Sequence, residues 1–288
     1  MVVDPLADSR IIRLIETALM EDAAMGDPTT ESIVPEHHVS HGEFLCKADG
    51  IVAGLDVAGL VLRHCDESVS FVPSVHDGQE VRVGSVLAAV HGPTRALLLG
   101  ERTALNFLQR MSGIATLTRR YVNAVAGTRA RITDTRKTVP GLRVLDKLAV
   151  RAGGGVNHRF GLDDMILIKD NHVVAAGGPA KALSACRRYL DACGLKLPIE
   201  VETRNLDEVR EVLDAGGVDR VMFDNFPPDA LHAAVQLVSG RVETEASGGI
   251  TLANVREVAA SGVDYISVGA LTHSVTALDI SLELTPHV

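Results

Sequence analysis

The chain has 288 residues and a formal net charge of -9 at pH 7; 46% of its residues are hydrophobic and only 3% are aromatic. This length allows one large domain or two ordinary ones, and the apolar share is enough for a full core. The acidic balance and the scarcity of aromatic side chains argue against a nucleic-acid-binding protein, which needs a basic surface or stacking platforms. Any binding of an anion must therefore come from a local cluster of cations.

The cysteines and the N-terminus indicate a cytoplasmic protein. None of the four cysteines forms a CxxC pair, which fits a reducing compartment. The N-terminus lacks a basic segment followed by an apolar core, and no run approaches the ~18 apolar residues of a membrane span. We therefore expect no membrane association.

The first 90 residues predict a helix followed by an antiparallel sheet. Apolar residues from Ser9 to Ala24 recur on one helical face, and Gly26 to Thr30 predict a turn. Short apolar runs separated by turn residues then predict strands, with a helix from Val57 to Cys65 packed on them. These runs are 44–47, 51–53, 69–72, 79–83 and 86–90.

A long helix is predicted to begin at Thr94 as N-cap and to run through Met111, with Arg102 on its surface. A second helix, 116–126, is expected after Gly113. We place the domain boundary here: an N-terminal α+β sandwich domain of residues 1–112, rejoined by 277–288, and an α/β barrel domain of residues 113–276. The alternation of 279–284 is typical of a strand, which we expect to return to the N-terminal sheet.

The second half alternates predicted strands and helices, which is typical of a parallel sheet with right-handed crossovers. Six such units fall short of the eight of a complete barrel, so the fold class is α/β with an incomplete barrel. The predicted strands are 131–134, 165–169, 198–202, 220–224, 242–246 and 264–268.

The stretch from Asp134 to His172 reverses the sign of the chain's charge. Two buried strands frame it, and its cations fall in the loops that follow strand ends. Cations brought together repel one another, so the arrangement favours binding of a multiply charged anion. A solvated basic surface is the alternative. The side chains concerned are Arg136, Lys137, His158, Arg159, Lys169 and His172.

This stretch resembles the signature of the quinolinate phosphoribosyltransferases, which are decarboxylating nicotinate-nucleotide pyrophosphorylases. Thr-Arg-Lys-Thr, Pro-Gly-Leu-Arg, Gly-Gly-Gly, Asn-His-Arg and Leu-Ile-Lys-Asp-Asn-His occur in the family's order. Val139, Asp146 and Leu148 depart from it where relatives often carry Thr, Glu and Tyr. Gly26 to Thr30 and Ser247 to Gly249 also fit, so the likeness spans nearly the whole chain.

The resemblance implies an open-faced, seven-stranded α/β barrel and a type II phosphoribosyltransferase of de novo NAD biosynthesis. Its substrates would be quinolinate and phosphoribosyl pyrophosphate, and its products nicotinate mononucleotide, pyrophosphate and CO2. Mg²⁺ is the implied cofactor, with Glu200 and Asp224 as the donor-site acids that hold it directly or through water. A homodimer or higher even oligomer is implied as well, with Arg102 reaching the neighbouring subunit's site.

The remaining roles follow from ligand chemistry at the strand ends, where barrel sites lie. Guanidinium groups match adjacent carboxylates, so Arg136 and Arg159 are the predicted quinolinate clamps. Around them we expect Thr135, Lys137, His158 and Lys169, the two lysines also reaching pyrophosphate and Lys137 acting in catalysis with Glu200 and Asp224. Backbone amides of small residues predict a phosphate site at Ser247, Gly248, Gly249, Val268, Gly269 and Ala270.

Two other functions remain open from the sequence. A related phosphoribosyltransferase could use another pyridine acid, such as nicotinate itself, or the chain could belong to a molybdenum-associated relative of the family. A non-catalytic sensor of quinolinate or nucleotide is the alternative outside enzymes, although the acids at 200 and 224 argue against it.

Overall fold

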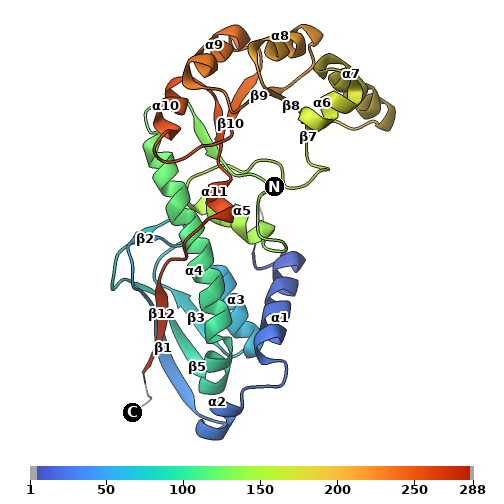
Figure 1. Cartoon of the computed structure of the whole chain (residues 1–288). Helices are drawn as coiled ribbons and strands as arrows, with labels where there is room; N and C mark the ends of the chain where they lie inside the picture. Colours follow the sequence, from blue (N-terminus) through green and yellow to red (C-terminus); the bar gives the residue numbers. More distant parts are fainter. Residues whose placement is uncertain (1–4, 286–288) are drawn as a thin grey trace. The chain divides into compact units, whose positions relative to one another are not determined.

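The computed structural model describes residues 5–285, which form two compact units (Figure 1). The first unit contains the described residues up to Arg119, Thr138–Gly154, and those from Leu271 onward. The second contains Arg120–Lys137 and Gly155–Ala270. The domain boundaries inferred from the sequence remain predictions.

The first unit is built on an antiparallel sheet of order β12-β1-β5-β3. Side chains of β1 alternate between buried and exposed, which is the pattern of a sheet with one covered face. The last strand pairs with β1, so the expected return of the chain's end to this sheet is confirmed. The strands are β1 (Val39–Cys46), β3 (Ser70–Pro73), β5 (Val86–Pro93) and β12 (Ile280–Thr285), with β2 (Gly50–Ile51) and β4 (Glu80–Val81) forming a separate pair.

Helices α1 (Ser9–Ala23) and α3 (Leu55–Cys65) lie close to their predicted positions. The predicted turn at Gly26 to Thr30 is instead the start of a short helix, α2 (Pro28–Ile33). The Asp27 side chain accepts hydrogen bonds from the amides of Thr29 and Thr30, and proline at the first position suits a helix. The turn prediction missed this capping pattern.

Helix α4 (Thr94–Ala124) is continuous, so the prediction of two helices separated at Gly113 was wrong. A side chain at Gly113 would collide with the backbone of Thr276, so this glycine permits a close approach and does not end the helix. Arg110 of α4 holds the buried carboxylate of Asp146 at 2.9 Å in α5 (Arg143–Ala152).

The second unit is built on a parallel sheet of order β6-β11-β10-β9-β8-β7. The α/β class is confirmed, although the sheet has six strands in the described chain where about seven were expected. Beside β6, Val156 makes a single parallel bridge to Thr133, and the neighbouring glycines give it no run of strand-forming residues. The strands are β6 (Arg131–Thr133), β7 (Ile166–Ile168), β8 (Ile199–Thr203), β9 (Arg220–Asp224), β10 (Glu243–Ser247) and β11 (Tyr265–Ser267).

Helices connect these strands and cover the outer side of the sheet (Figure 1). The core between the helices and the sheet includes Val209 and Val212 of α8 (Leu206–Ala215) and Val221 and Phe223 of β9, which are all buried. Right-handed crossovers of this kind bring the carboxyl ends of all six strands to one edge. The helices are α6 (Asp170–Ala176), α7 (Pro179–Cys193), α8 (Leu206–Ala215), α9 (Pro228–Val238), α10 (Val255–Ala260) and α11 (Ala270–His273).

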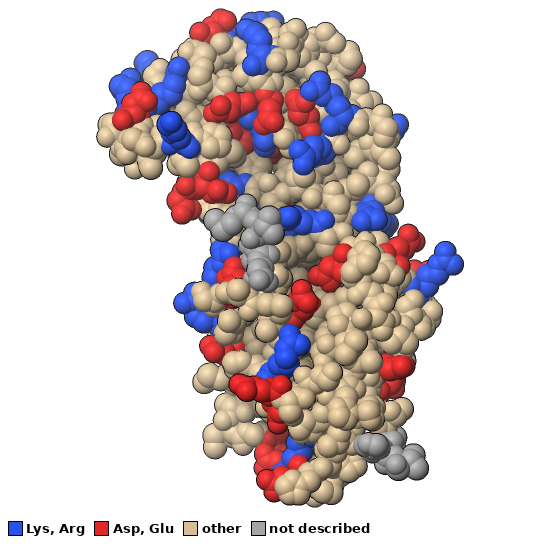
Figure 2. Space-filling model, turned by 180° about the vertical axis from the view of Figure 1, so that it is seen from behind, with Lys and Arg blue, Asp and Glu red and all other residues tan. Residues whose placement is uncertain are grey.

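Within residues 5–285, no helix is both long enough and apolar enough to cross a bilayer. On the face drawn in Figure 2, basic and acidic side chains are interspersed. That mixture differs from the extended basic surface of a protein that binds nucleic acid through its backbone phosphates.

The cysteines are free thiols: Cys46, Cys65, Cys186 and Cys193.

Candidate active site

A cavity of about 500 Å³ lies in the second unit at the carboxyl ends of the parallel strands. It combines four cations, three acids and a glycine-rich loop, with few apolar atoms between them. Its walls are Thr135, Arg136, Lys137, His158, Arg159, Leu167, Lys169, Glu202, Met222, Asp224, Asn225, Glu245, Ser247, Gly248, Gly249 and Ser267.

Asp134, directly after β6, fixes the loop that carries two of these side chains. Its fully buried carboxylate accepts a hydrogen bond from the Asn157 side chain at 2.6 Å and from the His158 amide at 2.9 Å. A buried carboxylate needs such donors, and here they come from a segment more than 20 residues away. The loop is therefore held to the strand end although it has no regular structure.

Arg159 is 8% exposed and donates from Nη1 to the Met165 carbonyl oxygen at 2.9 Å. Burial, and then the positive charge of Arg136, lower the pKa of its guanidinium. Guanidinium groups stay charged in proteins, so this lowering records an unfavourable environment for the cation. An anion bound between Arg136 and Arg159 would make this environment more favourable for the Arg159 cation.

Lys169, Glu202 and Asp224 form a second charged group. The Lys169 ammonium lies 3.4 Å from the Glu202 carboxylate. Burial raises the pKa of Glu202; Lys169 lowers it and Asp224 raises it. Two carboxylates that line one cavity, one of them with its pKa raised by the charge of the other, form a site for an additional cation.

The glycine loop after β10 is shaped by its backbone. Gly248 has φ +90°, and a side chain there would collide with Asn225, which itself has φ 55°. The Asn225 amide donates to the Ser247 carbonyl oxygen at 2.8 Å, tying the ends of β9 and β10 together. Only glycine combines this conformation with this contact, which leaves the loop amides accessible.

At the base of the cavity, three titratable side chains lie within 4.8 Å of one another: His158 and Glu245 of the wall, and Glu200 beneath it. His158 Nε2 is 2.9 Å from Glu200 and 3.6 Å from Glu245, and both glutamates are fully buried. Burial raises the pKa of each glutamate to about 7, and the charge of Arg220 opposes this effect. Arg220 Nη1 lies 2.9 Å from Glu245. If the two carboxyl groups together bind one proton, their remaining negative charge is balanced by the positive charge of Arg220.

Comparison with known proteins identifies the family. The model of the quinolinate phosphoribosyl transferase C-terminal domain matches residues 114–283, and that of the N-terminal domain matches residues 27–112. The chain belongs to the quinolinate phosphoribosyltransferase family. The predicted activity, phosphoribosyl transfer to quinolinate in NAD biosynthesis, is confirmed with it.

Individual relatives agree with this assignment. The chain is 46% identical over 286 residues to quinolinate phosphoribosyltransferase [decarboxylating] 1 of Nicotiana glauca, covering 94% of this chain and 81% of the relative. It is 46% identical to a probable nicotinate-nucleotide pyrophosphorylase of Bacillus subtilis, covering 95% and 93%. The crystal structure of NadC from Streptococcus pyogenes superposes with a TM-score of 0.93 at 38% identity, covering 100% and 99%.

Most of the residues predicted for quinolinate phosphoribosyltransferase chemistry line the one cavity. Those in its wall are Thr135, Arg136, Lys137, His158, Arg159, Lys169, Asp224, Ser247, Gly248 and Gly249. Val268, Gly269 and Ala270 follow β11 but are not in the wall as described. Arg102 is exposed on α4 and is not in the wall either.

Glu200 differs from the expectation that it faces a common space with Asp224. It is the second residue of β8 and pairs with Arg220, the first residue of β9, whereas Asp224 is the last residue of β9. Four residues along a strand span about 13 Å. Glu200 is therefore buried beneath the cavity, and Glu202, nearer the strand end, lies in its wall.

Sequence reasoning missed Glu245 and Ser267 as wall residues. Both lie within their strands, two residues before a position that the analysis did select: Ser247 and Gly269. Alternation along a strand puts residues i and i+2 on one face. That rule could have found them.

Proposed function

We propose that this quinolinate phosphoribosyltransferase binds both of its substrates in the cavity at the strand ends. The observation that carries the proposal is the shared wall: two guanidinium groups, two ammonium groups, three acids and a glycine loop surround about 500 Å³. Quinolinate and phosphoribosyl pyrophosphate are both polyanions, and the four cations in the wall attract such ligands locally despite the net negative charge of the chain.

Arg136 and Arg159 are the proposed clamps for quinolinate. Its two adjacent carboxylates match two planar guanidinium forks, which point charges would hold less specifically. The two arginines repel each other when no anion lies between them. A dianion bound between them removes this repulsion, so it is bound more strongly than a dianion beside a single cation. Thr135 and Lys137 complete this end.

The sugar phosphate is assigned to the opposite wall. Amides of Ser247, Gly248 and Gly249 would hold the 5-phosphate, and Lys137 and Lys169 the pyrophosphate. Glu202 and Asp224 fit a divalent cation, since both line the cavity and the charge of Asp224 raises the pKa of Glu202. When bound there, Mg²⁺ supplies positive charge to the leaving pyrophosphate.

The reaction then needs positioning more than it needs a covalent intermediate. The quinolinate ring nitrogen donates its lone pair to C1 of the ribose while the C1–O bond to pyrophosphate breaks and the electrons leave with that oxygen. The C–C bond to the 2-carboxylate next breaks and releases CO2, and the electron pair stays on C2, where the positive charge of the adjacent ring nitrogen stabilises it. A proton at C2 then completes nicotinate mononucleotide.

An assay of product stoichiometry tests this proposal. Purified protein, Mg²⁺ and phosphoribosyl pyrophosphate are mixed with quinolinate labelled in the 2-carboxylate, and labelled CO2, pyrophosphate and mononucleotide are counted. We expect equal amounts of all three, and far slower turnover with nicotinate, which offers one carboxylate to the two arginines. Equal rates with the two acids would contradict the arginine assignment.

We extend the proposal to a homodimer in which Arg102 completes the partner's cavity, and to function in the cytoplasm, as the free thiols favour. Size-exclusion chromatography tests the oligomer. Arg102→Ala and Arg136→Ala chains, each inactive alone, should regain part of their activity when mixed, since one site of the mixed dimer carries both arginines. Mixtures that stay inactive would contradict the shared site.

A further inference from the structure

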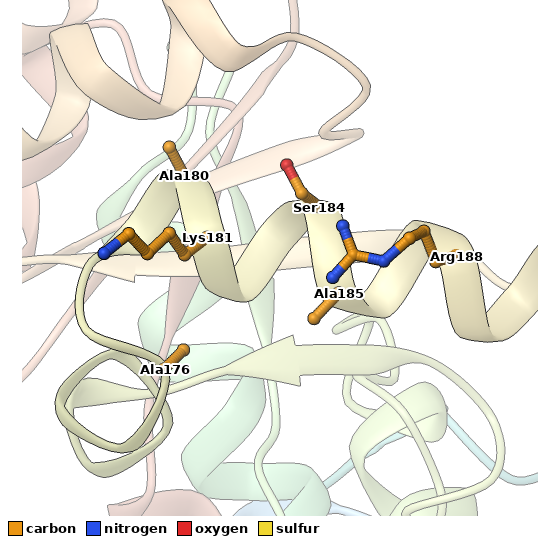
Figure 3. A pocket seen from close by; sticks show the side chains of 6 residues that line it. All are labelled: Ala176, Ala180, Lys181, Ser184, Ala185 and Arg188. Carbon is orange, nitrogen blue, oxygen red and sulfur yellow. The ribbon is translucent and has the colours of Figure 1, made fainter.

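A hollow on the outside of the second unit is a weak candidate for a site. It measures about 530 Å³ beside α7, where Lys181, Ser184 and Arg188 follow one side of the helix (Figure 3). Lys181 and Arg188 are exposed and Ser184 is half-buried, so the hollow has no buried polar group to orient a ligand. The buried group of His158, Glu200 and Glu245 is different, because its polar atoms have lost water and must be satisfied by one another.

The two ring nitrogens of His158 have distinct surroundings. Nδ1 accepts a hydrogen bond from the Arg159 amide at 2.8 Å, so a proton on Nδ1 would point at another N–H. The imidazole therefore carries its proton on Nε2, which faces Glu200 at 2.9 Å. Both nitrogens are engaged within the protein, and the predicted bond from His158 to quinolinate is not needed to explain its place in the wall.

The same tautomer argues against a metal ion in this group. A metal needs an unprotonated nitrogen, and Nε2 is the nitrogen that carries the proton. One histidine and two carboxylates within 4.8 Å would otherwise suit a divalent cation. The group is better described as a hydrogen-bonding floor under the cavity.

Arg220 anchors this floor from the far side. Its Nη1 lies 2.9 Å from Glu245, its Nη2 lies 2.9 Å from Glu243 at the surface, and its guanidinium stacks 3.9 Å above the Tyr265 ring. Three contacts on a planar group leave it little freedom. Glu245 is thereby fixed from behind while it faces the cavity in front.

We propose that Glu245, fixed by Arg220, is a positioning residue for quinolinate: it favours the Nε2–H tautomer of His158, whose Nδ1 in turn fixes the Arg159 main chain. Because the Arg159 guanidinium then enters the cavity from a set direction, the clamp is already formed when quinolinate arrives. This inference rests on the proposed role of Arg159 in quinolinate binding.

The test compares Glu245→Gln with Glu243→Gln. Both remove a carboxylate from Arg220 on the same strand, but Glu243 is 51% exposed in its side chain and does not line the cavity. We expect Glu245→Gln to raise the KM for quinolinate by about tenfold or more, as small misplacements do, with the KM for phosphoribosyl pyrophosphate within about twofold. Glu243→Gln should leave both within about twofold.

Whether the KM for quinolinate rises or falls in Glu245→Gln distinguishes a positioning role from a purely electrostatic effect of the carboxylate. Removing a negative charge beside a site for a dianion would by itself lower the KM for quinolinate, whereas loss of positioning raises it. A lower or unchanged KM in folded Glu245→Gln protein would overturn the inference. Wild-type protein that gives no mononucleotide at all would instead overturn the proposed function.

A second measurement needs no variant at position 245. Nitrogen-15 spectra of the histidine rings, with the His158 signal assigned from its absence in His158→Asn, report which nitrogen carries the proton. We expect a protonated Nε2 and an unprotonated Nδ1 in the wild type at neutral pH. A protonated Nδ1 would overturn the inference, also when Glu245→Gln fails to fold.

Discussion

The cations at the rim of the cavity (Arg136, Lys137, Arg159 and Lys169) and the charged groups of its floor (His158, Glu200, Glu245 and Arg220) are held in different ways. At the rim, Arg136 and Arg159 raise each other's energy and no acid lies within ion-pair distance of Arg159 among the described contacts. In the floor, Arg220 pairs with the Glu245 carboxylate, and burial raises the pKa of Glu200 to about 7. Cations that repel one another are suited to binding an anion, and paired charges are suited to holding a shape. Loss of a rim charge should therefore affect binding, and loss of a floor charge should affect geometry.

Removing a rim cation should have the largest effect. Arg136→Ala leaves a quinolinate carboxylate without its partner, which costs about 2 to 5 kcal/mol in binding. We expect turnover at ordinary quinolinate concentrations to disappear while the thermal unfolding temperature stays near that of the wild type. Arg188→Ala, which removes an exposed cation from α7, is the matched control. Wild-type kinetics in Arg136→Ala would remove this residue from the site.

The two acids of β8 provide the next comparison. Glu202→Gln should raise the Mg²⁺ concentration needed for half-maximal activity, because one of the two proposed ligands is lost. Glu200→Gln should leave that concentration unchanged, since Glu200 is buried beneath the cavity. Titration of activity with Mg²⁺ at saturating substrates measures both. The reverse result would return the metal role to Glu200.

Two glycine substitutions should distinguish the effect of backbone strain on stability from an effect on phosphate binding. Gly248→Ala and Gly240→Ala both place a side chain at positive φ, which costs about 1 to 2 kcal/mol of stability. A side chain at Gly240 meets nothing within 4 Å, whereas one at Gly248 collides with Asn225. Only Gly248→Ala should raise the KM for phosphoribosyl pyrophosphate. An unchanged KM would remove the loop from the phosphate site.

Protonation of the floor should have the smallest effect, seen in the pH dependence of stability. The pKa of Glu245 is raised from 4.5 to about 7, so the folded state binds the proton more tightly than the unfolded state. This contribution is present below pH 4.5 and is lost as pH rises toward 7, with an upper limit of about 3 kcal/mol. Relative to Glu245→Gln, the wild type should lose stability over this range in denaturant titrations. Parallel curves would contradict the raised pKa.

Much of this fold could be predicted because the strands of the second unit are short apolar runs separated by helical periodicity. Burial on both faces makes such runs continuous, and the signal survives without an alignment. Gly113 shows the limit: the residue that ends helices also permits close packing, and only tertiary contacts with Thr276 distinguish the two. The short helix after Asp27 was missed although its cap could have been recognised.

The rim was predictable and the floor was not. Arg136 and Lys137 follow β6 and Lys169 follows β7, so the chain order brings these three to one edge, and Arg159 lies in the loop before β7. Glu200 is the second residue of β8 and is not in the wall, whereas Glu202, one full repeat further along the strand, is. Arg220 pairs with Glu245 across strands that share no local pattern.

A crystal structure with quinolinate bound would test the central claim most directly. The account predicts the pyridine ring in the cavity at the strand ends, its two carboxylates within hydrogen-bonding distance of the Arg136 and Arg159 guanidinium groups, and the His158 ring still bonded to the Arg159 amide. Quinolinate bound elsewhere, or bound here with neither arginine in contact, would contradict it.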